Sequence, residues 1–176
     1  KPEHVIADAA ALGWNLHPFL NNEQLQILDV TGYFSSSKIA KKENLQVDRV
    51  IDDIIGFVKK SKTKRLAIDP IAPLIFSDQH IPEIIEYIRR LIFTIEDSTG
   101  CTTLMTSYVP VGSDKLSTHG IEEFAASGII VLKQVKFNNK RIRTVGIRKM
   151  RGTRIDLTEY SFEILPDRGV VLRQPI

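Results

Sequence analysis

The sequence alternates short apolar runs with amphipathic segments, and this order constrains the fold more than any other feature. Apolar residues at helical spacing predict one helix from Val47 to Val58 and a second from Pro82 to Ser98. Strands are predicted at Leu25–Val30, Leu66–Asp69 and Cys101–Thr106. Because strands that alternate with helices form a parallel sheet with helices on its faces, we predict an α/β fold.

The C-terminal part of the chain has a different pattern. Two β-rich runs, Gly128–Phe137 and Lys140–Met150, are joined at Asn138-Asn139, a pair that tolerates positive φ and favours a tight hairpin. Shorter strands are predicted at Tyr160–Leu165 and Val170–Leu172. An antiparallel edge of this kind is a common extension of a parallel sheet.

Length and composition fit one globular domain. The chain has 176 residues, of which 43% are hydrophobic and 26% charged, so we expect residues 1–176 to form a single domain. No apolar run is long enough to cross a bilayer, which argues against a membrane protein. Cys101 has no partner for an internal disulfide, which favours a reducing, cytoplasmic setting. The chain begins with Lys1 rather than Met, so we expect that sequence upstream has been removed or left out.

Charge gives little support for nucleic-acid binding. The formal net charge is only +3, and the densest basic run is Lys59–Arg65. This run follows the first predicted helix, so we interpret it as the solvated, cationic end that the helix dipole favours.

Asp69 is the most informative single residue, because it ends an apolar strand and is followed by Pro70. In open α/β sheets, ligands bind at the carboxyl ends of strands, where a carboxylate holds the hydration shell of Mg²⁺ against nucleotide phosphates. This is the Walker B interpretation. From these residues alone, an Asp that caps the following helix explains the pattern equally well.

A Walker A loop is absent from the chain. That loop needs Gly-x-x-x-x-Gly-Lys followed by Ser or Thr, because backbone N–H groups and one Lys surround the phosphates. The chain has ten glycines, and none of them is followed by Lys. The residues present therefore make at most an incomplete nucleotide site.

Two sequence blocks point to a family. Thr118–Ala125 reads Thr-His-Gly-Ile-Glu-Glu-Phe-Ala, and Lys149–Thr153 reads Lys-Met-Arg-Gly-Thr, followed by Glu159–Phe162. In this order and spacing, with Leu12–Leu16 and Thr102–Thr106, the chain resembles the KaiC family of RecA-superfamily ATPases. The resemblance implies a RecA-like P-loop NTPase core, a mainly parallel sheet flanked by helices with an antiparallel C-terminal extension, from which the Walker A part is missing.

The resemblance also implies a site. It suggests a ring, usually a hexamer, with ATP between neighbouring subunits and Asp69 as the Walker B carboxylate that binds Mg²⁺ through water. Lys149, Arg151 and Thr153 match the segment that reaches the neighbour's ATP. A Lys and an Arg separated by one residue on a strand share a face, and two cations there would neutralise charge on a transferring phosphoryl group. Without the resemblance, an exposed edge-strand pair that discourages aggregation explains Lys149 and Arg151 better.

The chain departs from the family pattern at several positions. The family's paired catalytic glutamates match positions just before Lys1, Ile155 stands where many members have His, and Tyr108 replaces an acidic residue. Glu122 and Glu123 occupy the positions of the Ser-Thr pair that one KaiC lobe phosphorylates. We therefore predict an ATPase-type lobe without autophosphorylation.

Three functions follow from this pattern. The first is an intact protein that hydrolyses ATP in a homohexameric ring for signalling or regulation, with the present chain inactive alone. The second is a catalytically inactive KaiC-like module that binds regulatory protein partners. The third is a RecA- or RadA-like paralogue that binds DNA, for which the only local support is the basic run Lys59–Arg65.

Overall fold

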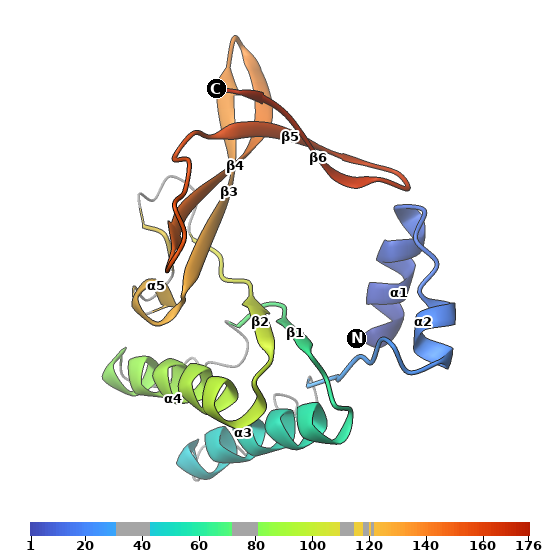
Figure 1. The fold of residues 1–176 in the computed structure, drawn as a ribbon, viewed down its shortest axis with the longest axis vertical. Coiled ribbons are helices and arrows are strands. Elements are labelled where there is room, and N and C mark those ends of the chain that lie inside the picture. The colour runs from blue at the N-terminus through green and yellow to red at the C-terminus, as the bar shows by residue number, and fades with distance from the viewer. Residues whose placement is uncertain (31–42, 72–80, 110–114, 118–119, 121) are drawn as a thin grey trace. The chain divides into compact units, whose positions relative to one another are not determined.

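The computed structural model describes residues 1–30, 43–71, 81–109, 115–117, 120 and 122–176 (Figure 1). The chain divides into two compact units. Residues 1–35 and 128–176 form the first, called the antiparallel unit after its sheet. Residues 36–127 form the second, the parallel unit.

The parallel unit contains a two-stranded parallel sheet and its crossover helix. Strands β1 (Arg65–Ile68) and β2 (Thr102–Met105) pair in parallel, with Ile68 opposite Met105. A parallel pair needs a long connection, and the helix α4 (Ile81–Thr99) lies within it. Helix α3 (Glu43–Lys60) precedes β1, and the short α5 (Glu122–Ala125) follows β2. Figure 1 shows α3 and α4 packed beside each other next to the two strands.

Most of the buried apolar side chains lie in the parallel unit. Apolar residues at helical spacing on α3 and α4 face each other, which buries a stripe from each helix. Among the described residues of this unit, the buried hydrophobic ones are Val50, Ile51, Ile54, Val58, Ile71, Ile84, Tyr87, Ile88, Leu91 and Ile95.

The antiparallel unit is built on a four-stranded sheet in the order β3-β4-β5-β6. Its strands are β3 (Gly128–Phe137), β4 (Lys140–Met150), β5 (Tyr160–Leu165) and β6 (Gly169–Pro175). Asn138 and Asn139 have φ of 46° and 61°, so both central residues of the β3–β4 turn are left-handed, as its tight hairpin geometry requires.

Two short helices, α1 (Pro2–Ala11) and α2 (His17–Asn21), complete this unit. Their connection contacts the β5–β6 turn. The backbone N–H of Asp167 donates to the carbonyl of Leu12 at 2.8 Å. A Cβ on Gly169 would lie 2.9 Å from the Trp14 ring, so only glycine lets the indole approach this closely.

The α/β fold class and most of the predicted elements are confirmed. The hairpin strands match at both ends, and the two long helices and the strands around them match within a few residues. The strand predicted at 25–30 is wrong: no strand is assigned there, because no described segment supplies the ladder hydrogen bonds that a strand needs. Among the described strands, the four antiparallel ones form a sheet of their own.

Within the described residues, no helix combines the length and the apolar character needed to cross a bilayer. The same residues contain no group of three or more His, Cys, Asp or Glu side chains suited to a metal ion.

Candidate functional site

Asp69 lies at the carboxyl end of β1, where the parallel register brings it next to the end of β2. The hydroxyl of Thr106 donates a hydrogen bond to Asp69 Oδ1. Backbone bonds on either side of Asp69 join its segment to Thr106: Thr106 N–H donates to the Ile68 carbonyl at 3.0 Å, and Ile71 N–H donates to the Thr106 carbonyl at 2.9 Å. The Asp69 residue is exposed, so its carboxylate is fixed in place and open to solvent.

The helix-cap explanation of Asp69 does not fit this geometry. Pro70 and Ile71 are not helical, and the next described helix begins at Ile81. The carboxylate instead bonds to Thr106, a side chain on the neighbouring strand end. Asp69 is thus an exposed carboxylate at the carboxyl edge of the parallel strands, the edge at which open α/β sheets bind ligands.

The chain after β2 adds a second set of polar contacts in the parallel unit. Ser107, which follows Thr106, donates to Glu122 Oε1 at 3.4 Å. The buried hydroxyl of Ser117 donates to Glu123 Oε1 at 3.0 Å and accepts the N–H of Gly120 at 3.0 Å. These contacts hold Glu122 and Glu123, the first residues of α5, to Ser107 and Ser117. Thr118, His119 and Ile121 of the same sequence block lie outside the described residues.

Lys149, Arg151 and Thr153 lie in the antiparallel unit, around the end of β4. Lys149 is half-buried and pairs with Ile129, whereas Arg151 and Thr153 are exposed. The strand ends at Met150, and the N–H of Thr153 donates to the Met150 carbonyl at 3.3 Å, which closes a turn. Arg151 therefore lies in the turn, and the strand alternation used to place it on the same face as Lys149 does not extend to it.

The structure thus brings the predicted residues together in two groups. Asp69 belongs to the parallel unit together with Thr106, while Lys149 at the end of β4 and Arg151 and Thr153 in the turn that follows belong to the antiparallel unit. Their assignment as magnesium and nucleotide contacts remains a prediction.

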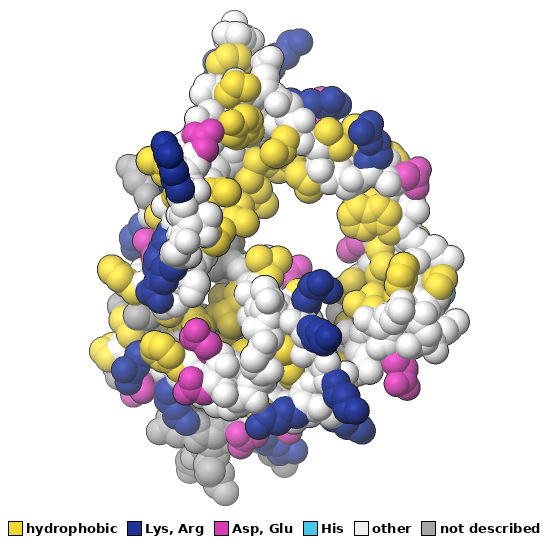
Figure 2. Space-filling model, in the orientation of Figure 1, with side chains coloured by type: hydrophobic (Ala, Val, Ile, Leu, Met, Phe, Trp, Pro, Cys, Tyr) yellow, Lys and Arg dark blue, Asp and Glu magenta, His cyan; other side chains and the backbone are white. Residues whose placement is uncertain are grey.

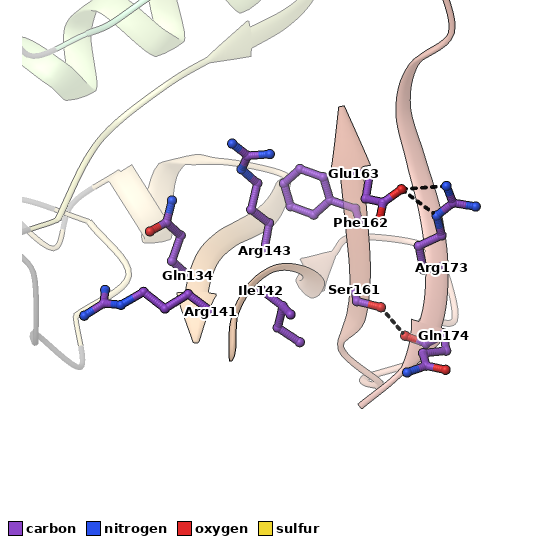
Figure 3. Close-up of a pocket in the computed structure, with 9 residues that line it drawn as sticks. All are labelled: Gln134, Arg141, Ile142, Arg143, Ser161, Phe162, Glu163, Arg173 and Gln174. Carbon is purple, nitrogen blue, oxygen red and sulfur yellow. Dashed lines mark hydrogen bonds and ion pairs between the residues drawn. The ribbon is translucent and has the colours of Figure 1, made fainter. Parts of the chain in front are cut away.

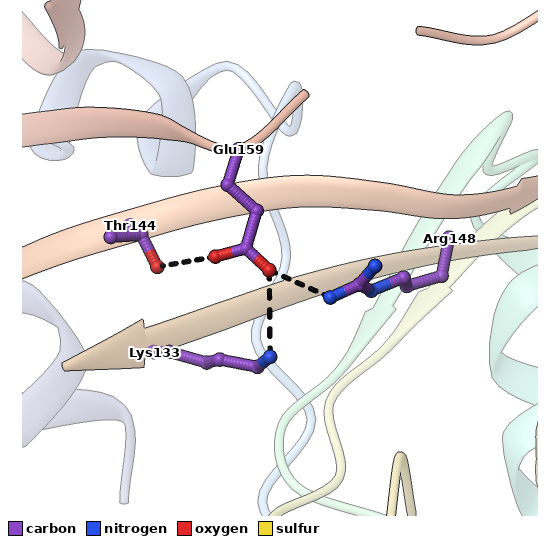
Figure 4. A network of polar contacts seen from close by, with 4 residues as sticks. All are labelled: Lys133, Thr144, Arg148 and Glu159. Atoms are coloured by element: carbon purple, nitrogen blue, oxygen red, sulfur yellow. Dashed lines mark hydrogen bonds and ion pairs between the residues drawn. The ribbon is translucent and has the colours of Figure 1, made fainter. Parts of the chain in front are cut away.

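A network centred on Glu159 was not anticipated from the sequence. Glu159 Oε1 lies 2.7 Å from an Arg148 guanidinium nitrogen and 3.5 Å from Lys133 Nζ, and Thr144 donates to Oε2 at 3.4 Å (Figure 4). Lys133 and Thr144 are cross-strand partners, so both reach the carboxylate from one face. A Cβ on Gly146 would lie 3.1 Å from Glu159 Cγ, so the missing side chain leaves room for the glutamate.

This network anchors the far end of the segment that begins at Arg151. Glu159 also accepts a backbone bond from Ile176 N–H at 2.9 Å, so side chain and main chain both hold it. The only signal in the sequence was a glutamate shortly after a cationic block. Its partners depend on strand register, which the sequence does not specify.

A local turn orders the middle of the same segment. Asp156 Oδ1 accepts the N–H of Thr158 at 2.9 Å and its hydroxyl at 2.7 Å, and Oδ2 accepts the Tyr160 hydroxyl at 3.0 Å. The Thr158 hydroxyl and N–H, and then Tyr160, lower the pKa of Asp156, and the same bond to Asp156 raises the pKa of Tyr160.

The comparisons with known proteins agree on one family. The family model described as "ATPase: KaiC" matches residues 1–175. The circadian clock oscillator protein KaiC of Prochlorococcus marinus strain SARG is 30% identical over 162 residues, covering 92% of this chain and 32% of that protein. KaiC of Prochlorococcus marinus subsp. pastoris is 30% identical over 172 residues, covering 98% of this chain and 33% of that protein. The chain therefore spans about a third of the length of these relatives.

A solved structure extends the agreement to three dimensions. The crystal structure of a KaiC-like protein from the hyperthermophilic archaeon Pyrococcus horikoshii OT3 superposes with a TM-score of 0.81 at 32% identity, covering 99% of this chain and 73% of that chain. The fold is that of a RecA-type α/β ATPase domain. The chain belongs to the KaiC ATPase family.

Proposed function

We propose that this chain contributes part of a nucleotide site that lies between subunits of a ring. The protein to which it belongs would bind ATP with Mg²⁺ there and hydrolyse the ATP. The observation that carries the proposal is the exposed Asp69 carboxylate, which Thr106 holds at the carboxyl edge of the parallel strands, in a chain of the KaiC family. Ligands of open α/β sheets bind at this edge.

The residues present fit the magnesium ion. Asp69 is exposed, it is an oxygen ligand, and its bond to Thr106 fixes its direction. Mg²⁺ keeps several of its waters, so an exposed carboxylate is suited to binding it through water. When bound, Mg²⁺ would neutralise charge on the nucleotide phosphates.

The turn after β4 fits the phosphates of an ATP held by the neighbouring subunit. Lys149 and Arg151 supply positive charge, and Thr153 supplies a hydroxyl close to them. The Asp156 turn and the Glu159 network fix the segment that follows, which limits the movement of Arg151. Fixed cations of this kind stabilise developing charge without reorganisation.

The proposal treats the chain as one KaiC-like domain of a homohexamer in the cytoplasm, with the Walker A loop and the catalytic glutamates supplied by sequence outside residues 1–176. No Walker A pattern occurs among the residues of the chain. ATP hydrolysis is accordingly proposed for the intact ring, and regulation or signalling for its role.

A mixed-ring experiment tests the shared site. In the intact protein, Asp69→Asn and the double change Lys149→Ala/Arg151→Ala should each lower ATP turnover by about 100-fold or more. Rings assembled from both kinds of subunit should recover part of the activity, because some interfaces then combine an intact Asp69 with an intact cation pair. Arg154→Ala, which removes an exposed cation beyond the same turn, is the control and should keep full turnover.

The outcome separates the candidate functions. If mixed rings recover no activity although each variant is inactive alone, the cations act within their own subunit and the shared site is wrong. If the unaltered intact protein assembles but does not hydrolyse ATP, the inactive interaction module is the better description.

A further inference from the structure

Positive charge is concentrated in one stretch of the antiparallel unit. The chain as a whole has a formal net charge of only +3, yet no Asp or Glu occurs from Gly128 to Ile155. The cationic residues of that stretch are Lys133, Lys136, Lys140, Arg141, Arg143, Arg148, Lys149, Arg151 and Arg154. The remainder of the chain is therefore net acidic.

These cations fall into two groups along the β3–β4 hairpin. In the first group, Lys133 and Arg148 contact Glu159, and Lys149 and Arg151 belong to the proposed nucleotide site at the end of β4. The other group lies toward the Asn138-Asn139 turn, where Lys136 is opposite Arg141 and Gln134 is opposite Arg143. Opposite and alternate residues of paired strands share a face, so these four side chains occupy one side of the hairpin. Within the described part of the chain, neither Arg141 nor Arg143 has a carboxylate at ion-pair distance.

Arg141 and Arg143 line a concavity of about 500 Å³ in the antiparallel unit (Figure 3). Phe162, only 8% exposed, is the cross-strand partner of Arg143 and lies beside it. On the opposite side, Glu163 and Arg173 form an ion pair of 2.6 Å and neutralise each other. The positive charge of the concavity therefore comes from Arg141 and Arg143 on its hairpin side.

We propose that this concavity binds an acidic, extended peptide segment of a partner protein. Arg141 and Arg143 are two residues apart on β4, so they are separated by about 7 Å, which is also the spacing of alternate side chains in an extended peptide. Guanidinium groups pair with carboxylates through two parallel hydrogen bonds, which favours acidic side chains as the partners. Gln134 offers a further amide at the same wall.

The same features argue against a nucleic acid. Single strands bind through exposed aromatic rings on which the bases stack, whereas the one aromatic residue that lines this concavity, Phe162, is buried.

The test measures binding of a short fluorescent peptide of alternating Glu and Thr to the intact protein by anisotropy. Arg141→Ala/Arg143→Ala should weaken binding by about tenfold or more, and Arg141→Lys/Arg143→Lys should lie between this variant and the unaltered protein, because charge remains and bidentate pairing is lost. The matched control is Lys59→Ala/Lys60→Ala, which removes the same charge from exposed positions at the end of α3.

Support requires that the control retain full affinity and that all variants keep their thermal unfolding midpoint. The proposal is overturned if the two Ala variants weaken binding equally, if a short oligo-dT binds more tightly than the peptide, or if the Arg variants change the oligomeric mass, which would make a second copy the occupant. Should Arg141→Ala/Arg143→Ala fail to fold, unchanged affinity of the Lys variant would overturn it as well. ATP turnover is not part of the readout, so this result is independent of the proposed nucleotide site.

Discussion

Each of the two units is stabilised internally by a different kind of interaction. The parallel unit buries a continuous set of apolar side chains between α3 and α4, and Ile88 and Leu91 are 0% exposed. The antiparallel unit buries only Ala9 and Phe162 among its described hydrophobic residues. It relies instead on hairpin ladders, on the Glu159 network and on the Asp156 turn.

The antiparallel unit also exposes many apolar side chains. Ile130, Leu132, Val170 and Leu172 are each more than half exposed, and Figure 2 shows apolar side chains along the surface of this sheet with Lys and Arg at its rim. Polar contacts fix direction better than they add stability, because water competes for each of them. The parallel unit thus supplies apolar burial, while the antiparallel unit supplies oriented charge.

The largest effect should come from a cavity in the parallel unit. Leu91→Ala should lower the free energy of unfolding by about 2–5 kcal/mol, because a fully buried side chain is lost and the helices α3 and α4 cannot close the gap completely. The measurement is chemical denaturation followed by far-UV circular dichroism.

The matched control is Leu132→Ala in the antiparallel unit, where the leucine is 65% exposed. It should change the free energy of unfolding by less than about 0.5 kcal/mol. If both substitutions lower the free energy of unfolding equally, the apolar face of the antiparallel sheet is covered in solution. The proposed difference in apolar burial between the two units would then be wrong.

The second prediction addresses the charge network. Glu159→Ala should lower the free energy of unfolding by about 1–2 kcal/mol, since it leaves Arg148 and Lys133 without their carboxylate. Glu163→Ala breaks a more exposed pair with Arg173 and should cost about 0–1 kcal/mol.

The rate of tryptic cleavage should distinguish the Glu159→Ala and Glu163→Ala variants at the segment after β4. Loss of Glu159 releases the segment that carries Arg151 and Arg154, so cleavage there should be faster than in the Glu163→Ala protein. Cleavage at equal rates in the two variants would contradict the anchoring role of Glu159.

Elements defined by local pattern were predictable from the sequence, and contacts defined by register were not. The β3–β4 hairpin was predictable because Asn138-Asn139 accepts the positive φ that its turn requires. The segment 25–30 has the apolar content of a strand, but a strand exists only with a partner, which composition does not reveal.

The candidate site shows the same division. Asp69 could be selected because it ends an apolar run, whereas its bond to Thr106 required the parallel register. The predicted strand already ended at Met150, and Gly152, with φ of 69°, follows Arg151, so the sequence itself placed Arg151 beyond the strand alternation. The Glu159 network joins β3, β4 and the residue before β5, and its only local signal was a glutamate shortly after a cationic block.

The third prediction concerns an imperfection in the apolar core. Tyr87 is 3% exposed, its hydroxyl has no hydrogen-bond partner within the described residues, and burial raises its pKa. Tyr87→Phe should leave the free energy of unfolding unchanged or raise it by up to about 1 kcal/mol, because the desolvated hydroxyl is removed without loss of a bond. Thermal unfolding measures this change. A decrease larger than about 1 kcal/mol would reveal a polar partner in solution and make the core of the parallel unit less purely apolar than described.

The smallest effect is the titration of Asp156, which reports polar order in the antiparallel unit. The hydrogen bonds from the Thr158 hydroxyl and N–H and from Tyr160 hold the pKa of Asp156 below its ordinary value of 3.8. Because the folded pKa is lowered, the stabilisation is present above the ordinary value and is lost as the pH falls through the lower folded value.

Carboxyl NMR measures this titration directly. Thr158→Ala removes the strongest of the three contacts and keeps the backbone one, so the pKa of Asp156 should rise toward 3.8. Tyr160→Phe should raise it less, and Ser161→Ala, whose hydroxyl donates to the Gln174 carbonyl, should not move it. If Thr158→Ala leaves the titration unchanged, the turn is not formed in solution, and the segment after Arg151 is held by Glu159 alone.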